Sequence, residues 1–429
     1  MRRQSAPRPT AQSEAQRLYQ MQQQKMMQGQ GVNASGAMDG FKALTQVIGK
    51  EQIQKASLTL QKYKEGKTQT ESRIVASENW WKLRNSTEEQ KTTNIGKDGG
   101  FMSVSGWLHN VIVSKHADAM ESFPEPNILP REEMDKEEAQ RLSNIVPCIL
   151  EQNQFEETYS DAMWQKIKSG TGVYKVVWDA GKLNGLGDIS VEQVNLLNIY
   201  WEPGVTDIQR SRYFFHTELC DKDLLEEQFP QLAGKLKGNS FMSTKFLYDD
   251  HVDTENKHTV IEVYYHKYVN GIKTLQYCKY VGDQVLYATE NEQRRPTQQM
   301  VDPVTGMQVE VEAGPSMAES GLYDHGKFPY VFDALFPIEG SPCGYGYVDI
   351  CRNPQMEIDL LKTSFVKNAM VGATPRYFSR GDGSVNEEEF LDLSKAIVHV
   401  NNASDDALRR IEHDTLDGMY VNVLDRTIQ

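Results

Sequence analysis

Apolar residues recur at helical spacing along most of the first 170 positions. Leu108 and Ile112, for example, fall on one face of a helix. The segments with this pattern are 41–65, 71–93 and 101–119. The N-terminal part of the chain is therefore predicted to be helical.

The next segment is a break followed by a longer helical stretch. Three prolines between Phe123 and Pro130 forbid a helix there. The helical pattern resumes at Asp135 and ends at Gly170, since glycine is the usual residue just past a helix end. Pro147 lies inside this stretch and is predicted to kink or divide it.

Strand patterns replace helical ones after Gly170. β-Branched and aromatic residues cluster or alternate in short runs separated by turn pairs such as Asn184-Gly185 and Asn270-Gly271. The predicted strands cover 173–178, 189–194, 212–219, 260–268, 274–281 and 284–287. Asp302–Gly306 is predicted to be a protruding hairpin or loop. Helices followed by antiparallel strands indicate the α+β fold class.

The last quarter returns to helix around a small mixed unit. A helix is predicted over 354–370 and a helical restart over 416–429, where the sequence stops without a C-cap signal. Between them we expect strand 374–379, helix 387–395 and strand 396–401. Asn386 and Glu389 form a predicted capping box at the start of the small helix.

The 354–370 helix is apolar on two sides. One stripe consists of Ile358, Leu361, Phe365 and Ala369, and the opposite one of Met356, Leu360 and Met370. Such a helix must bury both stripes, either between neighbouring subunits of a ring or in a protein core. Charged residues on the same helix, Glu357, Asp359, Lys362 and Lys367, are nearly balanced in sign.

Composition excludes several classes of protein. With 25% charged and 39% hydrophobic residues, the chain is globular rather than disordered or fibrous. No apolar run approaches the length of a membrane span, and no apolar segment follows Met1 as in a secretory signal. Five cysteines without a C-x-x-C pair argue against a disulfide framework or a structural zinc site.

The net charge of −14 is unevenly distributed. Residues 1–75 contain 12 Lys and Arg against 5 Asp and Glu, so they carry +7 and the remainder carries −21. An acidic body is a poor candidate for static binding along duplex DNA, because that affinity comes from phosphates neutralised by Lys and Arg. Residues 1–40 are Gln-rich and basic with few large apolar side chains, which predicts a disordered arm.

Catalytic and cofactor motifs are weak. Gly344-Tyr-Gly346 lacks the third glycine and the strand–turn–helix context of a dinucleotide loop, and Trp80-Trp81 is interpreted as packing rather than base stacking. A possible metal cluster, better explained as a charged surface loop, comprises Asp249, Asp250, His251, Asp253 and His258. We find no nucleophile–base pair, and expect no enzyme activity, no cofactor and no metal.

Several short motifs in a fixed order resemble those of tailed-bacteriophage portal proteins. They are Ser77–Lys82 (SENWWK), Lys115–Met120 (KHADAM), Pro124-Glu-Pro126, Asp135–Ala139, Gly170–Asp179 (GTGVYKVVWD), Gly187–Val191, Asn198–Pro203 (NIYWEP), Ser211–Phe214, Phe328–Val331, Gly344–Gly346 and Pro354-Gln355. The resemblance covers most of residues 75–429.

The resemblance implies a ring, usually of twelve subunits, at one capsid vertex of the virion. Its channel passes double-stranded DNA during packaging and ejection. The partners implied are other copies of the chain, the terminase large subunit, head-completion or connector proteins, and the capsid and scaffolding proteins. Assembly would occur in the cytoplasm of the bacterial host.

The resemblance also implies a division of the chain into wing, stem and clip. Residues 41–345 would form the wing, 346–370 the first stem helix, 371–415 the clip and 416–429 the start of the second stem helix, with the return to wing and crown missing. Ile358, Leu361, Phe365 and Ala369 would lie in the subunit interface. Glu357, Asp359, Lys362 and Lys367 are candidates to face the channel.

Two other functions stay open at this point. One is a virion adaptor or interaction protein without a DNA channel. The other is a metal-dependent nuclease, for which the sequence offers no defensible catalytic group. Rings with a central hole would distinguish a portal from both.

Overall fold

The structure is a computed structural model. It describes residues 47–83, 104–236, 256–295, 297–301, 308–312, 314–373, 377–379, 386–392, 397, 399, 408–411 and 418–428. The predicted arm over 1–40, four of the five candidate metal ligands (Asp249, Asp250, His251 and Asp253) and the predicted loop Asp302–Gly306 lie outside these residues.

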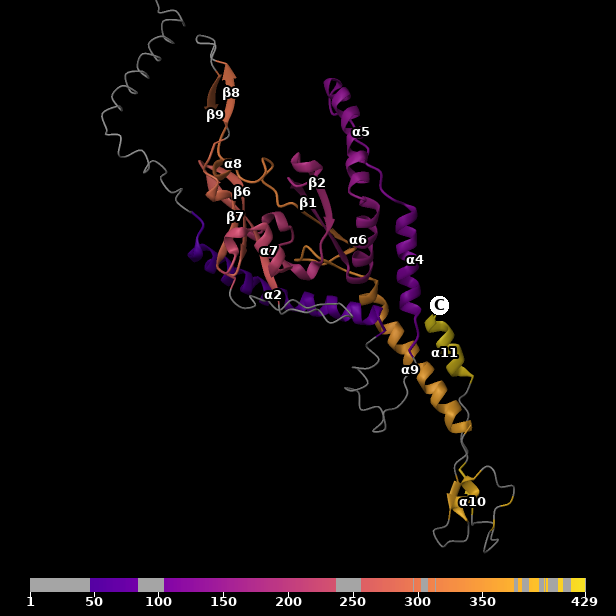
Figure 1. Cartoon of the computed structure of the whole chain (residues 1–429). Helices are drawn as coiled ribbons and strands as arrows, with labels where there is room; N and C mark the ends of the chain where they lie inside the picture. Colours follow the sequence, from indigo (N-terminus) through magenta and orange to yellow (C-terminus); the bar gives the residue numbers. More distant parts are fainter. Residues whose placement is uncertain are drawn as a thin grey trace, which may run out of the picture.

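Helices form the first part of the described chain and a long segment near its C-terminal end (Figure 1). The α-helices are α2 (Lys50–Trp81), α4 (Trp107–Glu121), α5 (Lys136–Gln152), α6 (Phe155–Ser169), α7 (Lys222–Gln228), α8 (Met317–Ser320), α9 (Tyr347–Ala373), α10 (Glu387–Leu391) and α11 (Met419–Ile428). Short 3-10 turns include η1 (Glu133–Asp135), η2 (Leu183–Gly185), η3 (Leu196–Asn198) and η6 (Thr289–Asn291).

The strands form antiparallel sheets. A three-stranded sheet has the order β10-β1-β2, with β1 (Thr171–Asp179), β2 (Asp188–Gln193) and β10 (Tyr330–Ala334). A five-stranded sheet runs in chain order through β3 (Ile199–Trp201), β4 (Tyr213–Asp221), β5 (Lys257–Val269), β6 (Ile272–Val281) and β7 (Gln284–Ala288). Two-stranded ladders pair β8 (Thr297–Val301) with β9 (Gln308–Glu312), β11 (Phe336–Pro337) with β12 (Gly344–Tyr345), and β13 (Tyr377–Ser379) with β14 (Leu408–Arg410). The α+β class is confirmed.

Helix α2 connects the sheets to the other helices. Near its start, Leu60 packs on the five-stranded sheet, in a buried cluster that includes Phe215 and Tyr280. Farther along, Ile74 joins the cluster between the two sheets. At its end, Trp80 packs with side chains of α4, α6 and α9. Apolar residues along one helix therefore fix the relative positions of both sheets and the helical layer.

One continuous α2 replaces the two helices expected over 41–65 and 71–93. Gly66 lies inside α2 and does not end it. Pro203 packs against Gly66 so closely that a Cβ there would lie 2.5 Å from Pro203 Cγ. The glycine therefore allows close approach of β3's flanking loop rather than ending the helix. Tertiary packing compensates the low helix propensity of glycine.

The division of the 135–170 stretch is also different from the prediction. Pro147 lies inside α5, and the break between α5 and α6 falls at Gln154, whose φ is +49°. The Asn153 amide donates hydrogen bonds to the carbonyls of Ile149 (2.7 Å) and Ile189. It thereby satisfies a free carbonyl at the end of α5 and ties that end to β2.

The prediction for the small C-terminal unit was right for its first strand and its helix and wrong for its second strand. Strand β13 pairs with β14, and the described residues Ile397 and His399 of the expected strand 396–401 lie in no strand. The backbone N–H of His399 instead donates to the Glu389 carboxylate at 3.0 Å. Asn386 accepts the N–H of Glu389 at the start of α10, as predicted for its half of the capping box.

Candidate functional site: the α9–α11 hairpin

The most distinctive feature of the molecule is a helical hairpin that leaves the α+β body. In Figure 1, α9 runs away from the body, the unit of β13, α10 and β14 lies at its far end, and α11 returns beside α9. With 27 residues, α9 is about 40 Å long at 1.5 Å per residue. The hairpin therefore carries the small unit well away from the two sheets.

The start of α9 is fixed by close backbone packing. The helix begins at Tyr347, seven residues before the predicted start at Pro354, which is the eighth residue of the helix. The Asp349 carboxylate accepts the Gly346 N–H at 3.1 Å and so caps the helix. A Cβ at Gly346 would lie 2.3 Å from the carbonyl oxygen of Lys168.

Gly344-Tyr-Gly346 is therefore a packing motif. A Cβ at Gly344 would lie 2.6 Å from the Phe336 carbonyl oxygen and 2.7 Å from that of Gly170. Arg73 on α2 donates to the Gly344 carbonyl at 2.7 Å. Both glycines are needed because backbone from α6 and β11 occupies the space of a side chain.

A buried polar cluster joins α9 to the start of α4. The Asp359 carboxylate accepts hydrogen bonds from the Ser105 N–H (2.9 Å), the Ser105 hydroxyl (2.5 Å) and the Gln355 amide (3.1 Å). Gln355 Oε1 accepts the Leu108 N–H at 3.0 Å. The N-cap residue Gly106 has no side chain to offer, and Gln355 of α9 supplies an acceptor for the first turn of α4 instead.

This cluster corrects one predicted site residue. Asp359 is only 4% exposed and its Oδ1 accepts three hydrogen bonds inside the chain, so it does not belong to the channel-facing candidates. The same polar line continues to Thr363, whose hydroxyl donates to the Asp359 carbonyl at 2.6 Å. Gln355, Asp359 and Thr363, spaced four residues apart, are the signal that the sequence analysis missed.

The other residues predicted to lie in the subunit interface differ in how exposed they are. Ile358 is buried within the chain and is not available to another subunit. Leu361 and Phe365 are half-buried, and Ala369 is exposed. On the opposite side of α9, Leu360 is 40% exposed. A single chain thus leaves part of both apolar stripes uncovered.

The charged candidates lie on the same helix. Glu357 and Lys362 are exposed and Lys367 is half-buried. Among the described residues, no ion pair joins either lysine to a carboxylate on another helix. Whether they face a channel stays a prediction.

The two tryptophans at the end of α2 pack, as expected. Trp80 is buried with Leu108 and Val348. Trp81 stacks on His109 with ring centroids 4.1 Å apart, and Trp164 stacks on His116 at 3.8 Å. These ring contacts hold α4 against α2 and α6.

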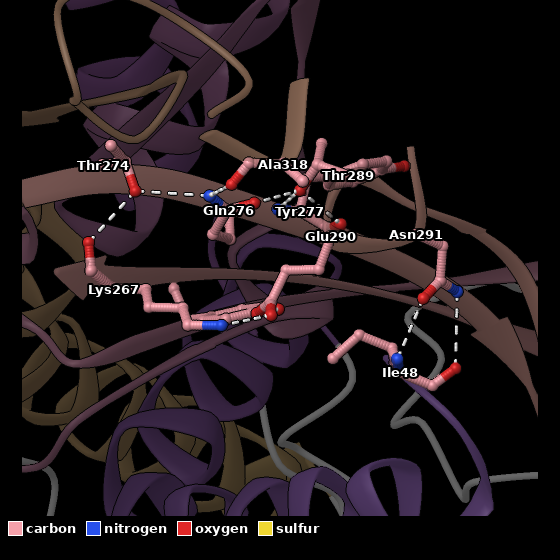
Figure 2. A network of polar contacts seen from close by, with 10 residues as sticks. Ile48, Lys267, Thr274, Gln276, Tyr277, Thr289, Glu290, Asn291 and Ala318 are labelled. Atoms are coloured by element: carbon pink, nitrogen blue, oxygen red, sulfur yellow. Dashed lines mark hydrogen bonds and ion pairs between the residues drawn. The ribbon is translucent and has the colours of Figure 1, made fainter. Parts of the chain in front are cut away.

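A second polar network surrounds η6 (Figure 2). Asn291 exchanges two hydrogen bonds with the backbone of Ile48, and the Glu290 carboxylate binds the Lys267 ammonium and the Tyr265 hydroxyl (2.5 Å). Thr289 donates to Gln276 at 2.6 Å. The network attaches the segment before α2 to the five-stranded sheet, at the edge of a cavity of about 370 Å³. The Glu290 carboxylate and the Lys267 ammonium on its wall are already paired with each other.

Of the candidate metal ligands, the structure describes only His258. The described residues contain no cluster of three His, Cys, Asp or Glu side chains that could hold a metal ion. His258 is buried in β5 rather than on a surface loop, and burial, with the nearby Lys222, lowers its pKa. All five cysteines are free. Among the described helices, none combines the length and apolar character of a membrane span.

The comparisons with known proteins agree with this architecture. The model of the phage P22-like portal protein family matches residues 118–363, which is more than half of the chain and extends from α4 into α9. No individual curated protein matches. The chain belongs to the P22-like phage portal protein family.

Proposed function

We propose that this chain is the subunit of a ring at a capsid vertex of the virion, with the α9–α11 hairpins around a channel for duplex DNA. The observation that carries the proposal is the hairpin itself, a 27-residue helix that leaves the body, turns through a small β-α-β unit and is partnered on return by α11. Leu360, Leu361 and Phe365 keep exposed apolar surface that neighbouring hairpins would cover.

The charge distribution supports a channel through which DNA slides rather than a surface that binds DNA tightly. Residues 76–429 carry −21, and the exposed or half-buried charges at the middle of α9 are Glu357, Lys362 and Lys367. Carboxylates repel phosphate, and isolated lysines give brief contacts. Because each close phosphate contact contributes a salt slope of about −0.9, a channel with few contacts binds duplex DNA weakly at physiological salt.

The unit of β13, α10 and β14 is the proposed docking site for the terminase and later for connector proteins. Its two-stranded ladder is too small to be stable alone and would be completed by neighbouring units in the ring. The chain itself would act as a structural component, without enzyme activity or cofactor. Capsid and scaffolding proteins would contact the body.

Electron microscopy of the purified chain tests the proposal. We expect rings with a central hole wide enough for duplex DNA. Monomers that cleave DNA in the presence of a divalent metal would favour the nuclease alternative, and assemblies without a hole would favour an adaptor.

DNA binding by the assembled rings tests the channel directly. We expect weak affinity with a shallow dependence on salt, and a still smaller salt slope when Lys362 and Lys367 are replaced by alanine. Lys62→Ala, at an exposed position of α2, is the matched control and should leave the slope unchanged. Tight binding that survives about 200 mM salt would contradict a sliding channel.

A further inference from the structure

Helix α5 presents an apolar surface that none of the described residues covers. Met134 is 90% exposed, Leu142 47% and Ile145 50%, and together with Glu138 they follow one side of η1 and α5 at spacings of four, four and three residues. We call these four residues the α5 surface. Only Ala139 of the whole helix is buried, and Figure 1 shows most of α5 standing clear of the sheets.

A second uncovered surface lies at the turn between β5 and β6. Tyr268 is 72% exposed and Ile272 68%, and Lys273 beside them is exposed. We call these three residues the β5–β6 tip. Asn270 and Gly271 both have positive φ in this tight turn, and a Cβ at Gly271 would meet no atom within 4 Å. The tip therefore projects into open space.

The two surfaces have opposite charge. Residues 131–145, which include the α5 surface, contain five carboxylates against three Arg and Lys, a net charge of −2. Residues 264–276 contain no carboxylate and two lysines, of which Lys267 pairs with Glu290 and Lys273 does not. Among the described residues, neither Glu138 nor Lys273 has an ion-pair partner. Opposite potentials on two apolar patches are the pattern of surfaces that bind each other.

The two surfaces cannot meet within one chain. In Figure 1, α5 stands on one side of the body and the five-stranded sheet, with β6 and β7, lies on the other, separated by β1 and β2. A ring is built from heterologous contacts, in which each subunit offers a different surface to each of its two neighbours. Two complementary surfaces on opposite sides of one subunit meet that requirement.

We infer that the α5 surface of one copy packs against the β5–β6 tip of a second copy, with Glu138 facing Lys273. Tyr268 and Ile272 cover Leu142 and Ile145, which removes apolar area of both copies from water. The contact lies in the body, away from the α9–α11 hairpin, and rests on the proposed ring. It gives each subunit a second point of attachment and fixes the angle between neighbours.

Crosslinking tests the contact. In a Cys148→Ser background, which removes the exposed native thiol of α5, the chain carrying Ile145→Cys and Ile272→Cys should give a ladder of covalent oligomers under mild oxidation. The matched control pairs Ile145→Cys with Leu186→Cys, at a position that is 81% exposed but outside both surfaces, and should give no ladder.

Charge reversal gives an independent readout. Glu138→Lys or Lys273→Glu alone should raise the concentration needed for half-assembly about tenfold, because like charges then face each other. The two reversals together should restore assembly. Glu227→Lys on α7, an exposed position outside both surfaces, is the control and should have no effect.

The outcomes separate this inference from the proposed function. Rings that form normally but give no ladder and no rescue would overturn the contact and leave the ring standing. If the unaltered chain forms no ring at any concentration, the proposed function fails and the contact fails with it. A ladder together with rescue supports both.

Discussion

The Lys175 ammonium lies 2.9 Å from the Glu262 carboxylate, and this buried ion pair joins the three-stranded sheet to the five-stranded one. Lys175 belongs to β1 and Glu262 to the middle of β5. The carboxylate also binds His216 (3.3 Å) and the Tyr277 hydroxyl (3.1 Å), and Lys279 lies 3.4 Å away. A charge at this depth is tolerated because several donors surround it.

Replacing Glu262 with glutamine should destabilise the body strongly. The change leaves the Lys175 ammonium buried without a countercharge, which costs about 3–5 kcal/mol in the free energy of unfolding. Urea denaturation of the two proteins measures it. The matched control is Asp283→Asn, which breaks a 2.7 Å ion pair with Lys50 that is exposed and therefore contributes at most about 1 kcal/mol.

Glu262 should also make the free energy of unfolding depend on pH. Burial alone would raise the pKa of Glu262, but the hydrogen bond from His216 and the charges of Lys175, His216 and Lys279 outweigh it and hold the pKa well below 4.5. Because the pKa of Glu262 is lower in the folded chain than in the unfolded chain, the stabilisation is complete above the unfolded pKa. It is lost progressively as the pH falls from the unfolded pKa to the folded pKa. The difference in unfolding free energy between wild type and Glu262→Gln should therefore shrink below about pH 4.5. An unchanged difference in acid would contradict the prediction.

The α+β class and most strands could be predicted from sequence because each depends on local pattern. Strands β5 and β6 are rich in β-branched and aromatic residues, and the Asn270-Gly271 turn between them is a strong signal. The ends of helices were less predictable, since distant residues decide them. Gly66 continues α2 because of Pro203, and α5 ends at Asn153 because its side chain reaches β2.

Asp359→Ala should destabilise the attachment of α4 to α9. The Ser105 N–H and hydroxyl would lose a buried acceptor, which costs about 1–3 kcal/mol. Asp359→Asn keeps one acceptor oxygen and should cost less. Hydrogen exchange at the Ser105 amide, whose acceptor is removed, should accelerate in Asp359→Ala more than exchange in β5. If Asp359→Ala instead altered DNA binding by assembled rings and left exchange unchanged, Asp359 would face the channel after all.

The candidate site shows why helix faces are hard to assign from one sequence. Ile358 and Phe365 belong to the same stripe, yet Ile358 is buried against its own body and Phe365 lies farther out on the hairpin, half-buried. Spacing gives the face of a helix but not which part of the helix the body covers. Asp359 carried the same ambiguity, because a carboxylate on a long helix is usually solvent-exposed, and only the position of Ser105 reveals its role.

Lys67 should make stability rise with pH in the alkaline range. Burial lowers its pKa from 10.5 to about 8, while its ammonium donates to the carbonyls of Leu196 and Ile199 and lies 4.6 Å from the centre of the Tyr200 ring. Between these two pKa values the unfolded chain binds more protons than the folded one, so the free energy of unfolding increases with pH by roughly 3 kcal/mol. Lys67→Met should lack this increase. Parallel pH profiles for the two proteins would contradict it.

Gly346→Ala should be far more harmful than an ordinary glycine substitution. The new methyl group would lie 2.3 Å from the Lys168 carbonyl oxygen, so the start of α9 must shift away from the end of α6. Overpacking of this kind costs about 1–3 kcal/mol or more. Gly418→Ala is the control, because a Cβ there meets no atom within 4 Å. Thermal unfolding should separate the two variants clearly, and equal melting temperatures would refute the close contact.

Phe365→Ala should weaken the assembled ring more than it weakens the single subunit. Within one chain the ring of Phe365 is only half-buried, so the loss in subunit stability is limited. If neighbouring hairpins bury the rest, truncation of a buried phenylalanine costs about 3–5 kcal/mol in total, and the difference appears on assembly. Dissociation of rings in urea, followed by light scattering, measures the assembly part, and unfolding of the dissociated subunit measures the rest. Leu186→Ala, at an exposed turn position, should change neither. Rings of undiminished stability with Phe365→Ala would mean that the outer stripe of α9 faces solvent or the channel, and the interface would have to be carried by Leu360 on the opposite side.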